Sequence, residues 1–161
     1  TGKSNILEVW PNLEVYFHGG VNFNPYREQY KVLIPKENFR YYETYNASEG
    51  FFAIQDRNDS NELLLMLDYG IYYEFIPMNR FKGEDSTAIP LSEVKLDENY
   101  AMIITTNAGL WRYLIGDTIK FTSLKPYRIK ITGRTKHFIN VFGEELVVEN
   151  AKGLVKKQDL L

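Results

Sequence analysis

The stretch YAMIITTNAGLWRYLIGDTIKFTSLKPYRIKIT, residues 100–132, decides the fold that the sequence predicts. Apolar, aromatic and β-branched side chains dominate it, and Asn, Gly, Asp and Pro interrupt it at short intervals. This pattern is typical of short β-strands joined by turns. We expect strands over Tyr100–Thr106, Gly109–Tyr113, Thr118–Ser123 and Arg128–Thr132.

The residues before this stretch predict further strands and turns. One alternating run ends at Gly19-Gly20, which indicates a strand followed by a turn. Two other runs flank the polar residues 56–61 and predict a hairpin. Gly70 interrupts a long aromatic run, as a bulge or bend would. The expected strands are Leu13–His18, Phe39–Tyr45, Phe51–Gln55 and Glu62–Asp68.

Three short helices are expected around these strands. Asn24 as a cap and Pro in the first turn predict a helix over Pro25–Leu33, and Pro90–Val94 predicts a single helical turn. Gly143 opens a third predicted helix. Its apolar positions at helical spacing are Val147, Val148, Ala151 and Leu154. The elements together predict an α+β, β-rich fold, a twisted mixed sheet or distorted β-barrel with a few short helices at its margins.

The composition excludes several classes of function. The 161 residues are 44% apolar and 25% charged, as in an ordinary soluble globular protein, and the formal net charge is -2. Lys and Arg do not form the basic patch that a nucleic-acid interface needs. The chain has no cysteine, which excludes disulfides and thiol catalysis. Without a secretory signal or an apolar run of membrane length, we expect a cytoplasmic protein with neither nucleic acid nor membrane as a partner.

The opening residues, Thr1-Gly2-Lys3-Ser4, contain the Gly-Lys-Ser that ends a phosphate-binding P-loop. The first Gly of that motif would lie before the chain begins, and no strand precedes Lys3. We also expect the following segment to be extended rather than helical, so a P-loop is disfavoured. Since the chain lacks an initial Met, we expect it to be a piece of something larger.

The motif Tyr45-Asn46-Ala47-Ser48-Glu49-Gly50 has the residue types that hold a nucleotide. The Ser48 hydroxyl can donate to a phosphate oxygen, and the Glu49 carboxylate suits Mg²⁺, which prefers carboxylate and phosphate oxygens. Gly50 permits a positive φ and a close turn of the backbone. The Tyr45 ring is suited to lie on a purine. The alternative is a strand that ends in a polar turn.

A second motif, Gly116-Asp117, suits a ribose. A carboxylate just past a strand end can accept hydrogen bonds from both ribose hydroxyls, each contributing roughly 1.5–3 kcal/mol. Arg134, which follows Gly133, can pair with ribose or phosphate. The alternatives are a solvated turn aspartate and a surface arginine.

The ordered set Tyr-x-Ala-Ser-Glu-Gly, Gly-Leu-Trp-Arg-Tyr-x-x-Gly-Asp and Ile-Thr-Gly-Arg-Thr resembles the auxin-responsive Gretchen Hagen family of acyl-acid amido synthetases, in the adenylate-forming superfamily. The resemblance covers the chain from about Trp10 to Glu149. It implies a portion of a luciferase-like adenylation domain. Residues 1–134 would form the central and C-terminal part of the large domain, and residues 135–161 the hinge and the truncated start of the small domain.

In that family a carboxylate attacks the α-phosphate of ATP, pyrophosphate leaves, and an amine such as an amino acid displaces AMP. The resemblance therefore implies ATP and Mg²⁺ as cofactors, and a small carboxylic acid and an amine as substrates. It also implies a role for individual residues. These are Tyr45, Ala47 and Ser48 on the adenine and phosphate side, Glu49 on Mg²⁺, Asp117 on the ribose hydroxyls, Arg134 near the ribose at the hinge, and Gly19 and Gly20 at the turn beside the acyl pocket.

Two departures from the family pattern matter. Leu114 stands where the plant pattern has Arg, so that contact is lost or supplied elsewhere, for example by Arg112. The family's phosphate loop and the catalytic Lys of the small domain lie outside the chain, so we expect the chain alone to be inactive. A ligase that transfers the acyl group to coenzyme A and a non-catalytic β-rich binding module stay open as alternatives. The sequence identifies neither the acid, the acyl acceptor nor the oligomeric state.

Overall fold

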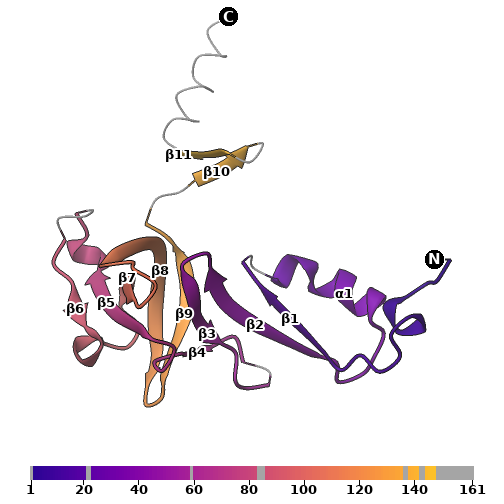
Figure 1. The fold of residues 1–161 in the computed structure, drawn as a ribbon. Coiled ribbons are helices and arrows are strands. Elements are labelled where there is room, and N and C mark those ends of the chain that lie inside the picture. The colour runs from indigo at the N-terminus through magenta and orange to yellow at the C-terminus, as the bar shows by residue number, and fades with distance from the viewer. Residues whose placement is uncertain are drawn as a thin grey trace, which may run out of the picture.

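The computed structural model describes residues 2–20, 23–58, 60–82, 86–135, 138–141 and 144–147, the last two segments by their backbone alone. Within these residues, nine strands form one mixed, strongly twisted sheet in the order β1-β2-β3-β4-β9-β8-β7-β5-β6 (Figure 1). Their bounds are β1 Val15–Gly19, β2 Arg40–Ala47, β3 Gly50–Ile54, β4 Leu63–Leu65, β5 Ile71–Pro77, β6 Ile89–Pro90, β7 Asn99–Thr106, β8 Tyr113–Leu124 and β9 Tyr127–Arg134. The predicted β-rich mixed sheet with short helices is confirmed.

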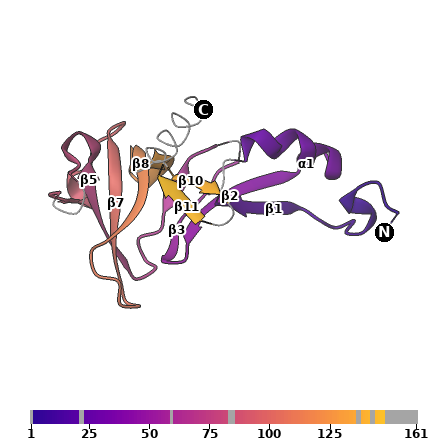
Figure 2. The same cartoon turned by 90° about the horizontal axis from the view of Figure 1, so that it is seen from above.

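The first two strands are parallel and are joined through a helix. The connection carries a 3-10 turn, η2 Asn24–Tyr26, followed by α1 Arg27–Leu33, which confirms the predicted helix. A parallel pair needs such a crossover because its strands run in the same direction. Figure 2 shows α1 alongside β1 and β2. The rings that pack between helix and strands are Tyr16, Phe23, Tyr30 and Tyr41.

Several smaller elements also match the sequence pattern. The predicted hairpin is β3 and β4, which pair antiparallel. Gly70, with φ of +72°, makes the predicted bend before β5. The predicted helical turn is η4 Leu91–Glu93, and η3 Met78–Arg80 follows β5. None of the helices in the described residues is long and apolar enough to cross a membrane.

The main core is aromatic and lies on one face of the sheet. Phe75, Tyr100 and Phe121, from β5, β7 and β8, are fully buried and meet edge to face, with ring centroids 5.1, 5.9 and 6.1 Å apart. Such pairs contribute about 0.5–1.5 kcal/mol each beyond the burial of their area. The same cluster reaches Phe52 on β3 and Tyr45 on β2. It therefore connects the strands on both sides of β4 and β9.

One predicted strand is wrong at the turn between β7 and β8, and the strand after it is confirmed but begins earlier than predicted. Residues 109–112 are not a strand, because Gly109 and Arg112 have φ of +103° and +48° and reverse the chain. The Gly109 N–H donates to the Thr106 carbonyl at 3.2 Å. The predicted strand Thr118–Ser123 is present as the second half of β8, which begins at Tyr113. Left-handed residues in a tight turn leave no trace in the apolar pattern.

The predicted helix from Gly143 is wrong where the structure describes it. Residues Glu144–Val147 form β11, which pairs antiparallel with β10, Phe138–Val141. A short apolar run is ambiguous between helix and strand, and here a nearby strand partner supplies the backbone hydrogen bonds. The other positions on which that helix depended lie outside the described residues; they are Val148, Ala151 and Leu154.

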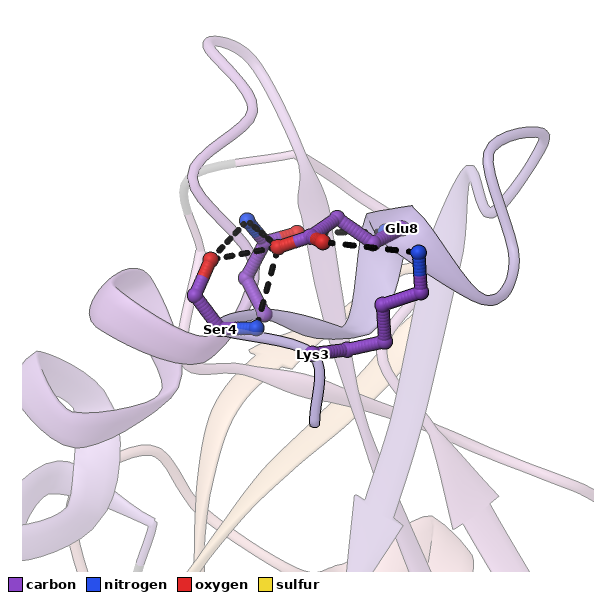
Figure 3. Close-up of polar contacts among 4 residues, drawn as sticks. Lys3, Ser4 and Glu8 are labelled. Carbon is purple, nitrogen blue, oxygen red and sulfur yellow. Dashed lines mark hydrogen bonds and ion pairs between the residues drawn. The ribbon is translucent and has the colours of Figure 1, made fainter. Parts of the chain in front are cut away.

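The N-terminal Gly-Lys-Ser precedes a capped 3-10 turn, and its Lys3 and Ser4 contact Glu8 of that turn (Figure 3). The Glu8 carboxylate accepts hydrogen bonds from the backbone N–H of Ser4, at 3.0 Å, and from its hydroxyl, and it pairs with Lys3 at 3.8 Å. Asn5 caps the 3-10 turn η1, Ile6–Glu8, by accepting from the Glu8 N–H at 3.2 Å. This segment is neither the extended one expected nor the long helix that follows a P-loop.

An ion pair between a buried arginine and a partly exposed aspartate joins the β3–β4 loop to β9. The Arg128 side chain is only 5% exposed, and its Nη2 and Nε lie 2.5 and 3.2 Å from the two carboxylate oxygens of Asp56, which is 27% exposed. The hydrogen bonds from Arg128 hold the pKa of Asp56 below its usual range. The pair therefore stabilises the fold while Asp56 is ionised.

We expect Asp56→Asn to lower the free energy of unfolding at pH 7 by about 3 kcal/mol, because it leaves the Arg128 charge buried without a counter-charge. The folded pKa of Asp56 is lowered, so this stabilisation is present above the pKa of an unfolded Asp, about 3.9, and is lost as the pH falls through the folded pKa. Urea unfolding of both proteins at pH 7 and at acid pH measures the effect.

The matched control is Asp97→Asn, which breaks an exposed pair with Lys120 and should change stability by less than about 1 kcal/mol. An Asp56→Asn effect that stays the same size in acid would contradict the role given to the charge.

Candidate functional site

Ser48 and Glu49 form the two-residue turn of the β2–β3 hairpin, in which Ala47 pairs with Gly50. Ala47 and Ser48 are exposed and Glu49 is half-buried. Gly50 lacks the positive φ expected for it. A Cβ there would lie 3.0 Å from Ile71 Cδ1, so a larger residue would crowd the packing of this turn against β5.

Asp117 lies inside β8 and not just past a strand end, which corrects the expectation for it. Gly116 before it has φ of +90°, and the pairing of β8 with β7 shifts register between Ala101 and Ile103. The Gly116 carbonyl accepts the N–H and the hydroxyl of Thr135, at 2.8 and 3.2 Å. A β-bulge of this kind re-aims a side chain without ending the strand.

The structure brings together three of the predicted site residues. Tyr45 Oη donates to Asp117 Oδ2 at 2.7 Å, and Arg134 Nε donates to Asp117 Oδ1 at 3.1 Å. Asp117 and Arg134 face each other across the β8–β9 ladder, whereas Tyr45 comes from β2, which is not a neighbour of β8. The side chain of Asp117 is 13% exposed and that of Arg134 is 49% exposed. Asp117 is thus a partly accessible carboxylate held by donors from two strands.

The Tyr45 side chain is buried, at 5% exposure, and its ring packs on Phe52 with centroids 5.0 Å apart. Burial, followed by the charge of Asp117, raises the pKa of Tyr45 far above its ordinary value. The hydroxyl therefore stays protonated and donates at neutral pH. The position of this ring beside a purine stays a prediction.

A second tyrosine–carboxylate contact joins β8 to the β2–β3 turn, with the tyrosine on β8 this time. Tyr113, the first residue of β8, has its hydroxyl beside the Glu49 carboxylate, and the interaction with this carboxylate raises the pKa of Tyr113. The sequence pattern indicates no role for Tyr113, although this residue stands in the motif that contains Asp117. Only the folding of β8 against the β2–β3 turn reveals the contact.

Glu49 offers one carboxylate to a metal ion. In the part of the chain that the structure describes, no three His, Asp or Glu side chains gather as a metal site made by protein alone would require. Mg²⁺ is commonly held by one or two carboxylates together with substrate phosphates. Glu49 therefore fits a magnesium ion that nucleotide phosphates help to hold.

Gly19 is the last residue of β1, beside β2, and Gly20 follows it. Gly19 pairs with Thr44, and a Cβ on Gly19 would lie 2.6 Å from the Thr44 carbonyl oxygen. Gly20 has φ of +80°. Because β1 and β2 are parallel, this turn and the Ser48–Glu49 turn lie at the same edge of the sheet. No hydrogen bond among the described residues joins either glycine to Asp117.

Leu114, which replaces the family Arg, and Arg112, the possible substitute for that Arg, both contact residues other than Asp117. Arg112 Nε donates to Glu74 Oε2 on β5 at 3.0 Å. Leu114 packs against the apolar cluster of Ile76, Ala101 and Ile103. Leu114 therefore contributes to packing where it stands.

The fold is that of the acyl acid amido synthetases of known structure. AtGH3.15 acyl acid amido synthetase in complex with 2,4-DB aligns with a TM-score of 0.63 and 19% identity, over 96% of this chain and 28% of that one. GH3.15 acyl acid amido synthetase gives a TM-score of 0.64 and 19% identity, over 94% of this chain and 29% of that one.

Two family models match the sequence. The GH3 family N-terminal domain matches residues 1–39, and the GH3 family central domain matches residues 64–134. These segments together make up more than half of the chain. The chain belongs to the GH3 family.

This chain aligns with only part of the length of each relative of known activity. Indole-3-acetic acid-amido synthetase GH3.3 of Arabidopsis thaliana is 30% identical over 124 residues, 73% of this chain and 20% of the relative. Indole-3-acetic acid-amido synthetase GH3.4 of the same plant is 26% identical over 95% of this chain and 28% of the relative. Jasmonoyl--L-amino acid synthetase JAR4 of Nicotiana attenuata is 46% identical over 30% of this chain and 9% of the relative. The chain spans less than a third of the length of each.

We expect Gly116→Ala to lower the free energy of unfolding by about 1–2 kcal/mol, because an L side chain at φ of +90° is strained. Space is not the cause, since the nearest heavy atom to the added Cβ is Thr135 Oγ1 at 3.9 Å. Urea unfolding measures the loss. Gly19→Ala is the contrasting variant, since its Cβ collides with backbone at 2.6 Å and should cost more. Unchanged stability of Gly116→Ala would contradict the left-handed bulge.

Proposed function

We propose that this chain is the nucleotide-binding part of an ATP-dependent acyl-acid amido synthetase, which adenylates a carboxylic acid and transfers the acyl group to an amine such as an amino acid. The observation that carries the proposal is Asp117, held by Tyr45 and Arg134 and still partly accessible. The names of the relatives, which are amido synthetases, favour an amide product over a coenzyme A thioester.

In this proposal each residue binds one part of the nucleotide. Asp117 accepts hydrogen bonds from the ribose hydroxyls, and the half-exposed Arg134 lies next to them. Ser48, exposed on the hairpin turn, donates to a phosphate oxygen, and Ala47 lines the adenine side of that turn. Glu49 holds Mg²⁺, which neutralises charge on the phosphates when it is bound. Gly19 and Gly20 border the acyl group.

Catalysis would come from alignment and charge neutralisation. The carboxylate substrate is already ionised, so its attack on the α-phosphorus needs no general base. The P–O bond to pyrophosphate breaks as the bond between the carboxylate oxygen and the α-phosphorus forms. The Asp117 cluster and Ser48 hold the nucleotide in position. The amine then attacks the acyl carbon, and AMP leaves. We place residues 1–134 in the large domain and residues 135–161 at the hinge, and we place the enzyme in the cytoplasm.

We expect Asp117→Asn to weaken ATP binding roughly ten- to a hundredfold in the intact protein that contains this chain. The loss corresponds to one or two charge-assisted hydrogen bonds to the ribose. Calorimetric titration with ATP and Mg²⁺, and with AMP, measures it. Asp97→Asn is the control, because Asp97 is an exposed aspartate paired with Lys120, and it should bind as the wild type does. Equal affinity of Asp117→Asn and wild type for ATP would contradict the assignment of Asp117 to the ribose.

The reaction itself is tested by product analysis. We expect the intact protein to release pyrophosphate when given an acid, ATP and Mg²⁺, and to form an amide with an amino acid or a hydroxamate with hydroxylamine. A coenzyme A thioester in place of the amide would favour the acyl-CoA ligase alternative. Failure to exchange pyrophosphate into ATP would favour a non-catalytic binding module. The chain alone is expected to release no pyrophosphate above a blank without protein.

A further inference from the structure

We propose that Tyr45 is a positioning residue that sets the orientation of the Asp117 carboxylate and thereby its preference for a complete ribose. This inference rests on the proposed function, and it assigns to the Tyr45 hydroxyl a task separate from any contact of its ring with the base. Its starting point is the 2.7 Å hydrogen bond from Tyr45 Oη to Asp117 Oδ2.

The acceptor capacity of Asp117 matches this task. An ionised carboxylate has about four lone-pair sites on its two oxygens. Tyr45 uses one site on Oδ2, and Arg134 uses one site on Oδ1. One site on each oxygen is then left for the two ribose hydroxyls. Both donors can therefore stay in place while the carboxylate accepts a nucleotide.

Of the two donors, Tyr45 is the rigid one. Its ring is buried on β2 and packs against Phe52, so few rotamers are open to it. Arg134 is a long, half-exposed side chain at the last residue of β9. A donor locked by packing restricts the rotation of the carboxylate at a low entropic cost, whereas ordering a long, half-exposed Arg side chain costs more side-chain entropy.

The same contact connects the two halves of the site. Tyr45 stands on β2 just before the Ser48–Glu49 turn, and Asp117 stands on β8, with β3, β4 and β9 between them in the sheet order. Tyr113 crosses in the opposite sense, from β8 to Glu49. These side-chain contacts therefore fix the position of the β2–β3 turn, proposed to bind the phosphates, relative to Asp117, proposed to bind the ribose. Tyr45 is the member of this brace that touches the ribose-binding carboxylate.

The test compares ATP with 2′-deoxyATP, by calorimetry, in the intact wild-type protein and in Tyr45→Phe. Wild type should bind ATP more tightly than 2′-deoxyATP. Tyr45→Phe keeps the ring and removes the donor, so we expect it to lose most of this preference, roughly tenfold, mainly through weaker binding of ATP.

The matched control is Tyr73→Phe. Tyr73 is a buried tyrosine of the same core cluster, and its hydroxyl donates to the Met66 carbonyl at 3.1 Å. Removal of either hydroxyl should lower the melting temperature, more so for Tyr45 because its hydrogen bond goes to a charged group, but Tyr73→Phe should keep the full preference for ATP. A merely structural role of Tyr45 would make the two variants alike in their preference for ATP over 2′-deoxyATP, whatever their melting temperatures.

The outcomes separate this inference from the proposed function. If wild type binds neither nucleotide, the proposed function fails and the inference falls with it. If wild type prefers ATP and Tyr45→Phe keeps that preference, only the positioning role is overturned. An equal loss of preference in Tyr45→Phe and Tyr73→Phe overturns it as well. Loss in Tyr45→Phe alone supports it.

Discussion

Edge-to-face packing of Phe75, Tyr100 and Phe121 is the interaction on which the rest of the structure depends. These rings come from β5, β7 and β8, and each is fully buried. Through the same cluster, Phe52 and Tyr45 are drawn from β3 and β2 toward β8. A flat sheet could not bring these strands together, because β3, β4 and β9 separate β2 from β8. The core thus holds the sheet in a twisted and curved form.

The candidate site is the polar margin of that aromatic core. Tyr45 has its ring in the core and its hydroxyl on Asp117, so it belongs to both. The bulge at Gly116 aims Asp117 toward β2, and Arg134 reaches the same carboxylate along the β8–β9 ladder. A hydrogen bond to a charged group contributes about 1.5–3 kcal/mol, so the cluster also helps to fasten β2 to β8.

The sequence predicted most strands, because each is a short apolar or aromatic run bounded by Gly, Pro or polar residues. It failed at residues 109–112 and at Glu144–Val147. In the first case two left-handed residues reverse the chain, and a pattern of apolar side chains carries no information on φ. In the second, a strand partner decided between two conformations that the apolar spacing allows equally. The motifs pointed to Tyr45, Asp117 and Arg134 separately, without indicating that they touch.

The sequence by itself determined that this is a β-rich chain of the GH3 family, because strand patterns and motif order are local properties of the residues. Only the tertiary structure decided that Asp117 is held by Tyr45 and Arg134, that Tyr113 lies beside Glu49, and that Gly50 packs closely against Ile71 without a positive φ. These contacts join residues far apart in the chain. They arise from the curvature of the sheet around its aromatic core, which is a collective result of packing and cannot be read from any one segment.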